Sequence, residues 1–278
     1  MPPEGLRTTA SPKVIVNADD LGISPGTNHA VRQAHLHGRL THASLMSNGD
    51  FALDAVRDVI RPCPGLAVGL HVNLTYGRPL TACAALSRNG ILQGGFTSIL
   101  RNTLQGHRAL LADAEREIDA QIRWMHAQGI RVDHINSHHH VHMIPAVFRV
   151  VKKLALDHGV PRIRIPDESF ALSIRVARGR SRMFRNGNLS KFLLMKVLVR
   201  VNSEPADRRF FSLLFTGGVS RPVLHRALKA RVPLEVMVHP GVPEMDASIR
   251  FYKDEQRRYR CSPGRRVELE ACLEQGSV

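Results

Sequence analysis

The stretch V-N-A-D-D-L-G-I-S, residues 16–24, joins the end of an apolar strand to the start of a helix through two adjacent carboxylates. The β-branched run 13–18 predicts a buried strand. Ser24-Pro25 is typical of a helix start, with serine as the cap and proline in the first turn, and Gly38 marks the end of that helix. The sequence therefore predicts a strand–helix unit with Asp19 and Asp20 between its two parts.

The same alternation of strand and helix continues along the chain. Further strands are predicted at 43–48, 66–74, 132–136, 162–165 and 234–238, and further helices at 50–60, 113–128 and 145–158. Residues 76–107 are rich in glycine and polar residues and predict a long loop or lid. This alternation favours a parallel α/β sheet or barrel. We expect a single domain over residues 1–278, with a basic insert at about 170–215.

Composition excludes several classes of protein. The 278 residues are 43% hydrophobic and 23% charged, which excludes a wholly disordered or fibrous chain. No apolar run is long enough for a spanning helix, and residues 1–13 lack the apolar core of a secretory signal. Four cysteines without a C-x-x-C pair suit a reducing compartment. We therefore expect a cytoplasmic protein.

Over half of the net charge of +15 lies in one segment, residues 175–209, where ten Lys and Arg face only two acidic residues. Such a segment favours contact with nucleic acid, an anionic membrane or a charged substrate, or is simply a solvated face. No aromatic residues alternate with its arginines as stacking platforms would, so nucleic acid is not expected. The apolar cluster 189–201 is compatible with a peripheral position at the inner membrane, with a homodimer contact and with an ordinary packed helix.

Residues able to do chemistry recur directly after the predicted strands, where the active face of an α/β barrel lies. Asp19 and Asp20 suit a metal ligand and a general base, or merely accept backbone hydrogen bonds at the turn. Five histidines within 134–142 favour a metal site, because imidazole is the commonest metal ligand. Taken alone, His71 is a hydrogen-bonded core histidine. His239 is either a general acid or a packed loop residue.

Three further residues are candidates for substrate binding. Arg162 and Arg164 alternate on a predicted strand and therefore point to the same side, where they would hold an anionic or carbonyl-bearing substrate. Surface arginines on a strand would give the same pattern. His142 is the third candidate, in the histidine tract. The sequence contains neither the nucleophile elbow of serine hydrolases nor a phosphate-binding glycine loop, which excludes those two types of site.

Five blocks of sequence together resemble the YdjC/ChbG-like carbohydrate deacetylase family. They are V-N-A-D-D-L-G-I-S (16–24), L-T-H-A-S-L-M-S-N (40–48), G-L-H-V-N-L-T (69–75), D-H-I-N-S-H-H-H-V-H-M (133–143) and E-V-M-V-H-P-G (235–241). The resemblance implies a distorted (β/α) TIM-like barrel related to polysaccharide deacetylases. It also implies one divalent metal ion, Mg²⁺ or Zn²⁺, and hydrolysis of the N-acyl group, most often acetyl, of an amino sugar.

The resemblance further implies a role for each residue of the site. Asp20, His71 and His138 would be the metal ligands. Asp19 would be the catalytic base, and His239 would be the acid that protonates the leaving amine. The motif departs from the family pattern at Leu21, where the family usually has Phe, and at Asn136, where sugar deacetylases typically carry Asp.

Two alternatives for the function stay open. Asn136 together with L-F-T-G-G (214–218) resembles the hopanoid-biosynthesis-associated branch of the family, which implies a lipid-linked sugar as substrate. The same metal site would also serve hydrolysis of another ester, amide or phosphoester bond. A different class is a non-catalytic basic protein that binds lipid or nucleic acid and whose histidines are structural.

Overall fold

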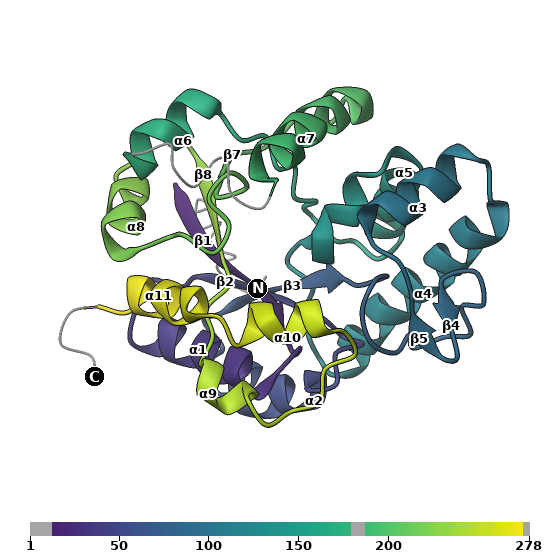
Figure 1. The fold of residues 1–278 in the computed structure, drawn as a ribbon, viewed down its shortest axis with the longest axis horizontal. Coiled ribbons are helices and arrows are strands. Elements are labelled where there is room, and N and C mark those ends of the chain that lie inside the picture. The colour runs from purple at the N-terminus through teal and green to yellow at the C-terminus, as the bar shows by residue number, and fades with distance from the viewer. Residues whose placement is uncertain (1–12, 179–186, 275–278) are drawn as a thin grey trace, which may run out of the picture.

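One parallel β-sheet forms the centre of the computed structural model, which describes residues 13–178 and 187–274 (Figure 1). The strands follow the order β6-β3-β2-β1-β8-β7. They are β1 (Val14–Leu21), β2 (His42–Leu45), β3 (Ala67–Val72), β6 (Ile135–Ser137), β7 (Arg209–Phe211) and β8 (Leu234–Val238). The sheet curls into half a barrel with helices around it. The predicted distorted TIM-like barrel is therefore confirmed.

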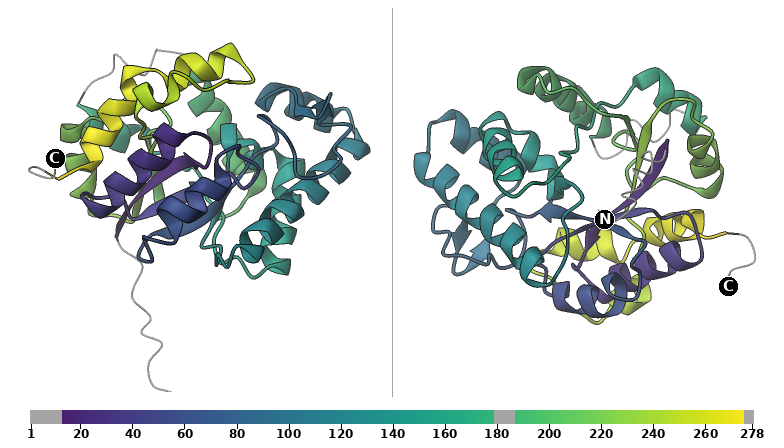
Figure 2. Two further views of the ribbon diagram at one scale, coloured as in Figure 1. Left: turned by 90° about the horizontal axis from the view of Figure 1, so that it is seen from below. Right: turned by 180° about the vertical axis from the view of Figure 1, so that it is seen from behind.

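The helices surround the curled sheet (Figure 2). They are α1 (Pro25–Leu36), α2 (Ala52–Ala55) with the π-helical turn Val56–Ile60, α3 (Phe96–Leu104), α4 (Arg108–Ala127), α5 (Pro145–Asp157), α6 (Phe170–Ala177), α7 (Asn188–Asn202), α8 (Arg221–Leu228), α9 (Pro243–Asp246), α10 (Asp254–Arg260) and α11 (Pro263–Cys272). Helices α9 and α11 pack on α1, so residues from the last part of the chain lie beside the first strand–helix unit.

The central strand β1 brings the acidic pair into the interior. Its parallel partners are β2 on one side and β8 on the other, with Val14 opposite Leu234 and Ala18 opposite Val238. Seven of its eight residues are buried, as expected for a strand covered on both faces. The strand ends at Leu21, three residues later than predicted, and its register with β2 shifts between Ala18 and Leu21, where the acidic pair lies. Ser24 caps α1 as predicted.

The prediction of a strand at 162–165 is wrong. Only Ile163 forms a bridge, to Ile135 of β6, and farther along Glu168 forms a second bridge, to Phe210 of β7. Pro161 and Pro166 flank this stretch, and proline lacks the N–H that a longer ladder needs. An irregular segment thus joins the two edges of the sheet.

The prediction of a structureless lid at 76–107 is also wrong in part. An antiparallel pair, β4 (Ser87–Arg88) and β5 (Ile91–Leu92), turns through Asn89-Gly90, both with positive φ. This dipeptide is a strong hairpin signal, and it stands between strands too short to show a period. Helix α3 follows, and α4 begins at Arg108, five residues before the predicted start.

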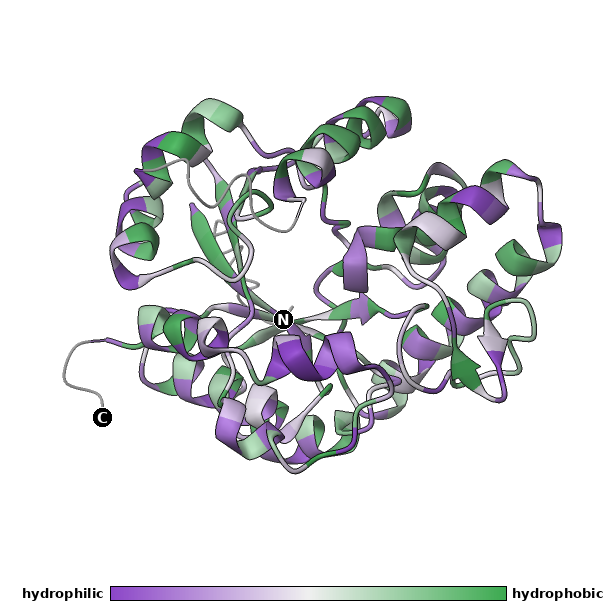
Figure 3. Cartoon of the chain, viewed as in Figure 1, coloured by the Kyte–Doolittle hydropathy of each residue, from purple (hydrophilic) through white to green (hydrophobic). Residues whose placement is uncertain are grey.

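The basic insert contains α6, α7 and β7. The outer face of α7 is unusually apolar, since Leu193, Val197 and Val201 are each more than half exposed (Figure 3). Residues 179–186, which carry part of the basic run, lie outside the described residues, as do residues 1–12, used for the prediction about a secretory signal. Among the helices described, none is both long and apolar enough to cross a bilayer.

Candidate metal centre

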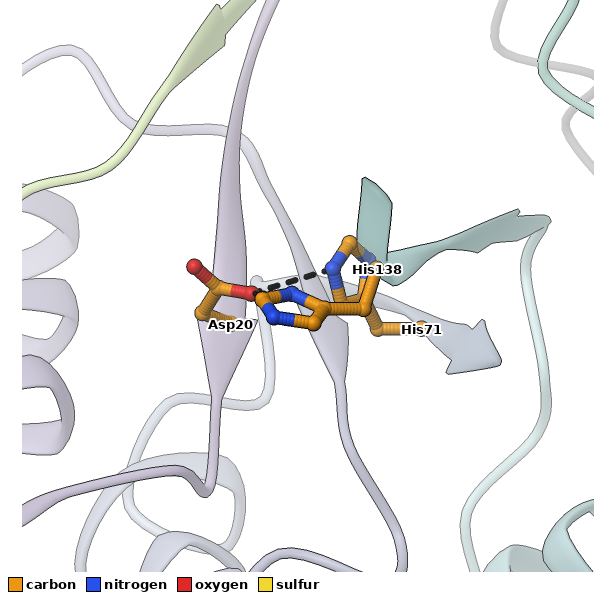
Figure 4. A group of neighbouring side chains, drawn as sticks. All are labelled: Asp20, His71 and His138. Carbon is orange, nitrogen blue, oxygen red and sulfur yellow. Dashed lines mark hydrogen bonds and ion pairs between the residues drawn. The ribbon is translucent and has the colours of Figure 1, made fainter. Parts of the chain in front are cut away.

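Asp20, His71 and His138 meet at the carboxyl edge of the sheet (Figure 4). Asp20 comes from the end of β1, His71 from β3, and His138 from the first residue after β6. One ligand atom of each lies within 4.8 Å of those of the other two. All three side chains are at most 6% exposed, so the group is almost closed to bulk water.

Several residues around this group have a left-handed backbone conformation, which residues other than glycine seldom adopt. Asp20 has a φ of 71°, and His139 and His140, directly after His138, have φ values of 57° and 55°. Left-handed backbone outside glycine costs roughly 1 to 3 kcal/mol per residue and is concentrated at functional sites. Here it turns the Asp20 carboxylate and the His138 ring toward each other.

The hydrogen bonds of His71 leave a lone pair facing Asp20. The Asn136 side chain donates through Nδ2 to Asp19 Oδ1 at 3.1 Å and to Ser44 Oγ at 2.8 Å, so its Oδ1 is the acceptor for His71 Nδ1–H at 2.7 Å. In the form of the ring with a single proton, Nε2 carries a lone pair, and it lies 3.1 Å from Asp20 Oδ1. Two lone pairs this close repel each other unless a cation lies between them.

The protonation states of His138 and Asp20 also favour binding of a cation. Burial lowers the pKa of His138, so that this ring is neutral near pH 7. Burial would raise the pKa of Asp20, but the Arg260 charge and the neighbouring His138 ring hold it well below its usual value. One ionised carboxylate and two imidazoles are a donor set that fits a divalent transition metal ion.

Asp19, the neighbour of Asp20, is held by four hydrogen bonds. Arg164 binds both of its oxygens, with Nη1 and Nη2 at 2.7 and 2.8 Å, and Asn17 and Asn136 donate to Oδ1. Burial would raise the pKa of Asp19, but the surrounding charges and hydrogen bonds, with the Arg164 guanidinium first among them, hold it well below its usual value. The side chain is thus ionised and fixed in orientation beside the candidate metal group.

The two arginines proposed for substrate binding face the same side, as their spacing implies. Arg164 Nε binds Glu235 Oε1 at 2.6 Å, and Arg162 Nη1 binds Glu235 Oε2 at 2.7 Å. Arg164 is 1% exposed, and both carboxylates that it binds belong to the protein. Its contact with substrate stays a prediction. Glu235, an acidic residue inside the apolar strand L-E-V-M-V, is the sequence feature that indicates a buried ion pair.

The remaining predicted residues lie at the margins of the group. His142 is fully buried: its Nδ1 lies 2.6 Å from Ser137 Oγ and its Nε2 donates to the Arg164 carbonyl. His239 follows β8, and burial lowers its pKa to about 4. Its Nδ1 has no hydrogen-bond partner in the described part of the chain and lies 4.0 Å from Glu268 Oε2. Substrate contact by His142 and acid catalysis by His239 stay predictions.

Behind the acidic pair, a second histidine supports the network. Ser44 Oγ accepts from both Asn17 and Asn136, so its own proton is directed to His134 Nε2 at 2.9 Å. The His134 ring lies against Gly69 of β3, where an added Cβ would approach three ring atoms to 2.5 Å. Glycine at this position gives the imidazole its place inside the barrel.

Gly69→Ala is therefore expected to displace His134 and to lower the free energy of unfolding by about 1 to 3 kcal/mol, the usual cost of overpacking. Gly65→Ala is the matched control, since its added Cβ would meet nothing closer than 3.8 Å. Urea unfolding of both variants measures the difference. Equal stabilities would show that the His134 ring moves at no cost.

A C-terminal group of residues, which the sequence analysis did not single out, closes the centre. Gln256 and Arg260 of α10 and Arg265 of α11 approach it: Gln256 Nε2 lies 3.4 Å from His138 Nε2, and Arg260 Nη1 lies 3.0 Å from Asp20 Oδ2. Arg260 and Arg265 are at most 1% exposed. The five arginines within 257–266 look like a solvated run, so the sequence offers no signal that two are buried.

Two histidines, one half-buried and one fully buried, make the fold sensitive to mild acid. Burial lowers the pKa of His42 to about 4 and that of His142 to about 3, against an ordinary value of 6.5 for each. At pH 5 each of these two histidines is therefore protonated in the unfolded chain and neutral in the folded chain. Their stabilising contribution is complete above pH 6.5 and decreases as the pH falls toward 4.

We expect the free energy of unfolding to fall by roughly 2 kcal/mol per histidine between pH 7 and pH 5. Urea unfolding at the two pH values measures the change. In His42→Gln the difference should be smaller by the contribution of this one histidine, roughly 2 kcal/mol. A stability that is independent of pH over this range would contradict the burial of neutral histidines.

Comparison with known proteins extends over nearly the whole chain. The profile of the YdjC-like protein family matches residues 13–276. The chain is 35% identical over 193 residues to the chitooligosaccharide deacetylase of Citrobacter koseri and 34% identical over 192 residues to that of Escherichia fergusonii. Each alignment covers 66% of this chain and 74% of the relative.

A solved structure has the same fold. It is a protein of Enterococcus faecalis V583 provisionally assigned to cellobiose-phosphate cleavage, which superimposes with a TM-score of 0.64 at 20% identity. The superposition covers 95% of this chain and 91% of the other. At this identity the likeness shows the fold alone.

Proposed function

This chain belongs to the YdjC-like family, and from that premise we propose that it is a metal-dependent carbohydrate deacetylase. The reaction is hydrolysis of the linear amide in an N-acylated amino sugar, with acetyl as the acyl group. The observation that carries the proposal is the buried group Asp20, His71 and His138 beside the ionised, hydrogen-bonded Asp19. The two relatives named chitooligosaccharide deacetylase support the substrate class.

Asp20, His71 and His138 would hold the ion, which would polarise the amide carbonyl and lower the pKa of a water molecule. Asp19 accepts the proton of the attacking water, and Arg164 keeps both of its oxygens oriented for that transfer. The proton that Asp19 takes from the water is the one that the departing nitrogen needs, and His239 would relay it to that nitrogen. Asn136 fixes the orientation of the His71 ring through Nδ1.

The chemical softness of the ligands narrows the choice of metal ion but does not fix it. Two imidazoles and one carboxylate suit Zn²⁺, Fe²⁺, Co²⁺ or Mn²⁺ better than Mg²⁺, and the family resemblance leaves Mg²⁺ open. The test is therefore made with each ion: metal content of the purified protein, followed by acetate release from N-acetylated chitooligosaccharides. One metal ion per chain with acetate release supports the proposal.

Other outcomes favour other functions. Metal without acetate release would direct the search to other acyl groups or to another ester, amide or phosphoester bond at the same centre. Failure to bind any of the ions after reconstitution would contradict the metal-dependent reaction. It would favour the non-catalytic lipid- or nucleic-acid-binding protein instead.

A lipid-linked sugar is a second candidate substrate, favoured by the exposed face of α7. Leu193, Leu194, Val197 and Val201 are 36% to 58% exposed, and Lys191 and Arg200 are exposed at either end of this row. An apolar row between basic side chains is typical of a helix that lies in a membrane interface. Asn202 at the end of α7 donates to the carbonyl of Met143, in the segment that carries His138. Binding here would bring the metal centre close to the lipid, with the protein peripheral to a membrane.

Val197→Glu is expected to abolish sedimentation with mixed phosphatidylcholine–phosphatidylglycerol vesicles at low salt, because it places a negative charge in the apolar row. Leu156→Glu is the matched control, since Leu156 is 83% exposed on α5. Equal sedimentation of the two variants would contradict the membrane contact. A shift from dimer to monomer in Val197→Glu without vesicle binding would assign the face to a homodimer.

A further inference from the structure

The two oxygens of the Asp20 carboxylate face opposite charges. Oδ1 faces the histidines, at 2.8 Å from His138 Nδ1 and 3.1 Å from His71 Nε2. Oδ2 faces two guanidinium groups, at 3.0 Å from Arg260 Nη1 and 3.9 Å from Arg265 Nη1. One carboxylate thus stands between the candidate metal position and a buried pair of positive charges.

Arg260 is built into the protein without the usual partners of a buried arginine. Its side chain is fully buried, its guanidinium lies 5.5 Å from the ring of Tyr259, and its Nη2 donates to Gln256 at 3.5 Å. Its Nε and Nη1 form no hydrogen bond with any residue that the structure describes, and Asp20 is its ion-pair partner. A buried charge is costly to maintain, so a role in folding alone explains this arrangement poorly.

The position of Arg260 matters for how Asp20 binds a cation. A carboxylate binds a metal ion through one oxygen or through both, and the second oxygen adds negative charge and fills a coordination position. A catalytic ion needs open positions and residual positive charge. An arginine on Oδ2 opposes the second contact, both by occupying that oxygen and by repelling the ion.

We propose that Arg260 is a positioning residue that keeps Oδ2 of Asp20 from the metal ion, which lowers the affinity for the ion and preserves its Lewis acidity. The inference rests on the metal centre proposed above. Arg265, farther from Oδ2 and hydrogen-bonded to Thr27 and Pro240, plays a smaller part. Loss of Arg260 should thus strengthen metal binding while it weakens catalysis.

The test uses the full-length protein, stripped of metal and titrated with Co²⁺, whose visible absorption weakens as its coordination number rises. For Arg260→Gln we expect about tenfold tighter Co²⁺ binding, a weaker visible band, and a kcat for acetate release that falls about 10- to 100-fold. Arg260→Lys keeps the charge and should stay near the wild-type affinity. Arg266→Gln is the control, since Arg266 is exposed and pairs with Glu244.

If Arg260 had a purely structural role, its replacement would not strengthen Co²⁺ binding. Weaker or unchanged Co²⁺ binding in Arg260→Gln, with the visible band of the wild type, would overturn the inference while leaving the metal centre intact. Absence of Co²⁺ binding by the wild type would overturn both. If Arg260→Gln does not fold, as judged by circular dichroism, Arg260→Met supplies the same comparison with an apolar side chain of similar length.

Discussion

Replacing His138 with alanine is expected to remove the metal ion and the hydrolytic activity together. His138 lies next to a carboxylate oxygen that also faces His71, so its loss leaves two ligands on an ion that needs at least three protein atoms. We expect kcat/KM to fall by more than about 10³-fold, since removal of a single oxyanion donor already costs about 10² to 10³. Elemental analysis and acetate release are measured on the same sample.

The control for this experiment is the adjacent histidine. His139 is exposed and takes a left-handed conformation, which asparagine tolerates, so His139→Asn should keep both metal and activity within a few-fold. If His138→Ala retained one metal ion per chain, the ligand assignment would be wrong. Equal losses of metal and activity in the two variants would mean that the histidine tract 138–142 supports the centre through its conformation rather than through His138 as a ligand.

Asp19→Asn is expected to separate catalysis from metal binding. The amide keeps the size of the side chain but accepts no proton, so kcat should fall by about 10² to 10⁴. Asp19 is not one of the three clustered ligands, so the metal content should stay at the wild-type value. Asp20→Asn is the matched comparison one residue away, and there the metal should be lost as well.

The buried ion pair requires a further measurement on this variant. Arg164 would keep Glu235 as its partner but lose the second charge, so a thermal melt must show that Asp19→Asn is folded at the assay temperature. Wild-type turnover in a folded, metal-loaded Asp19→Asn protein would contradict the assignment of Asp19 as the base.

How much of the centre could be predicted depends on where each residue stands in the sequence. The acidic pair and the histidine tract directly adjoin apolar strands, which makes them candidates, and the family resemblance names Asp20, His71 and His138 as the ligands. In the structure these three side chains lie together, with their ligand atoms within 4.8 Å of one another. Arg260 and Gln256 could not be named, because they belong to a short polar helix, α10, and Arg260 meets Asp20 of β1 from the opposite end of the sequence.

In the fold, too, features set by the local sequence could be predicted, whereas features set by contacts with distant segments could not. Strands such as β1 and β8 are predictable because a short β-branched run is itself the evidence. The segment around Ile163 has a similar run but lies between two prolines and at the margin of the sheet, where only one bridge forms. Propensity alone does not distinguish a central strand from such an edge.

The pairing of β1 with β8 has a consequence for the order in which the protein is made. Strand β1 leaves the ribosome long before one of its two neighbours, Leu234–Val238, which lies far behind it in the chain. Until those residues emerge, one edge of β1 stays unpaired, and contacts this distant in sequence form slowly. Helix α10 emerges later still, so the carboxylate of Asp20 is exposed to cellular cations before Arg260 reaches it. Metal loading during synthesis would therefore meet a more open and more negative centre than the finished protein has.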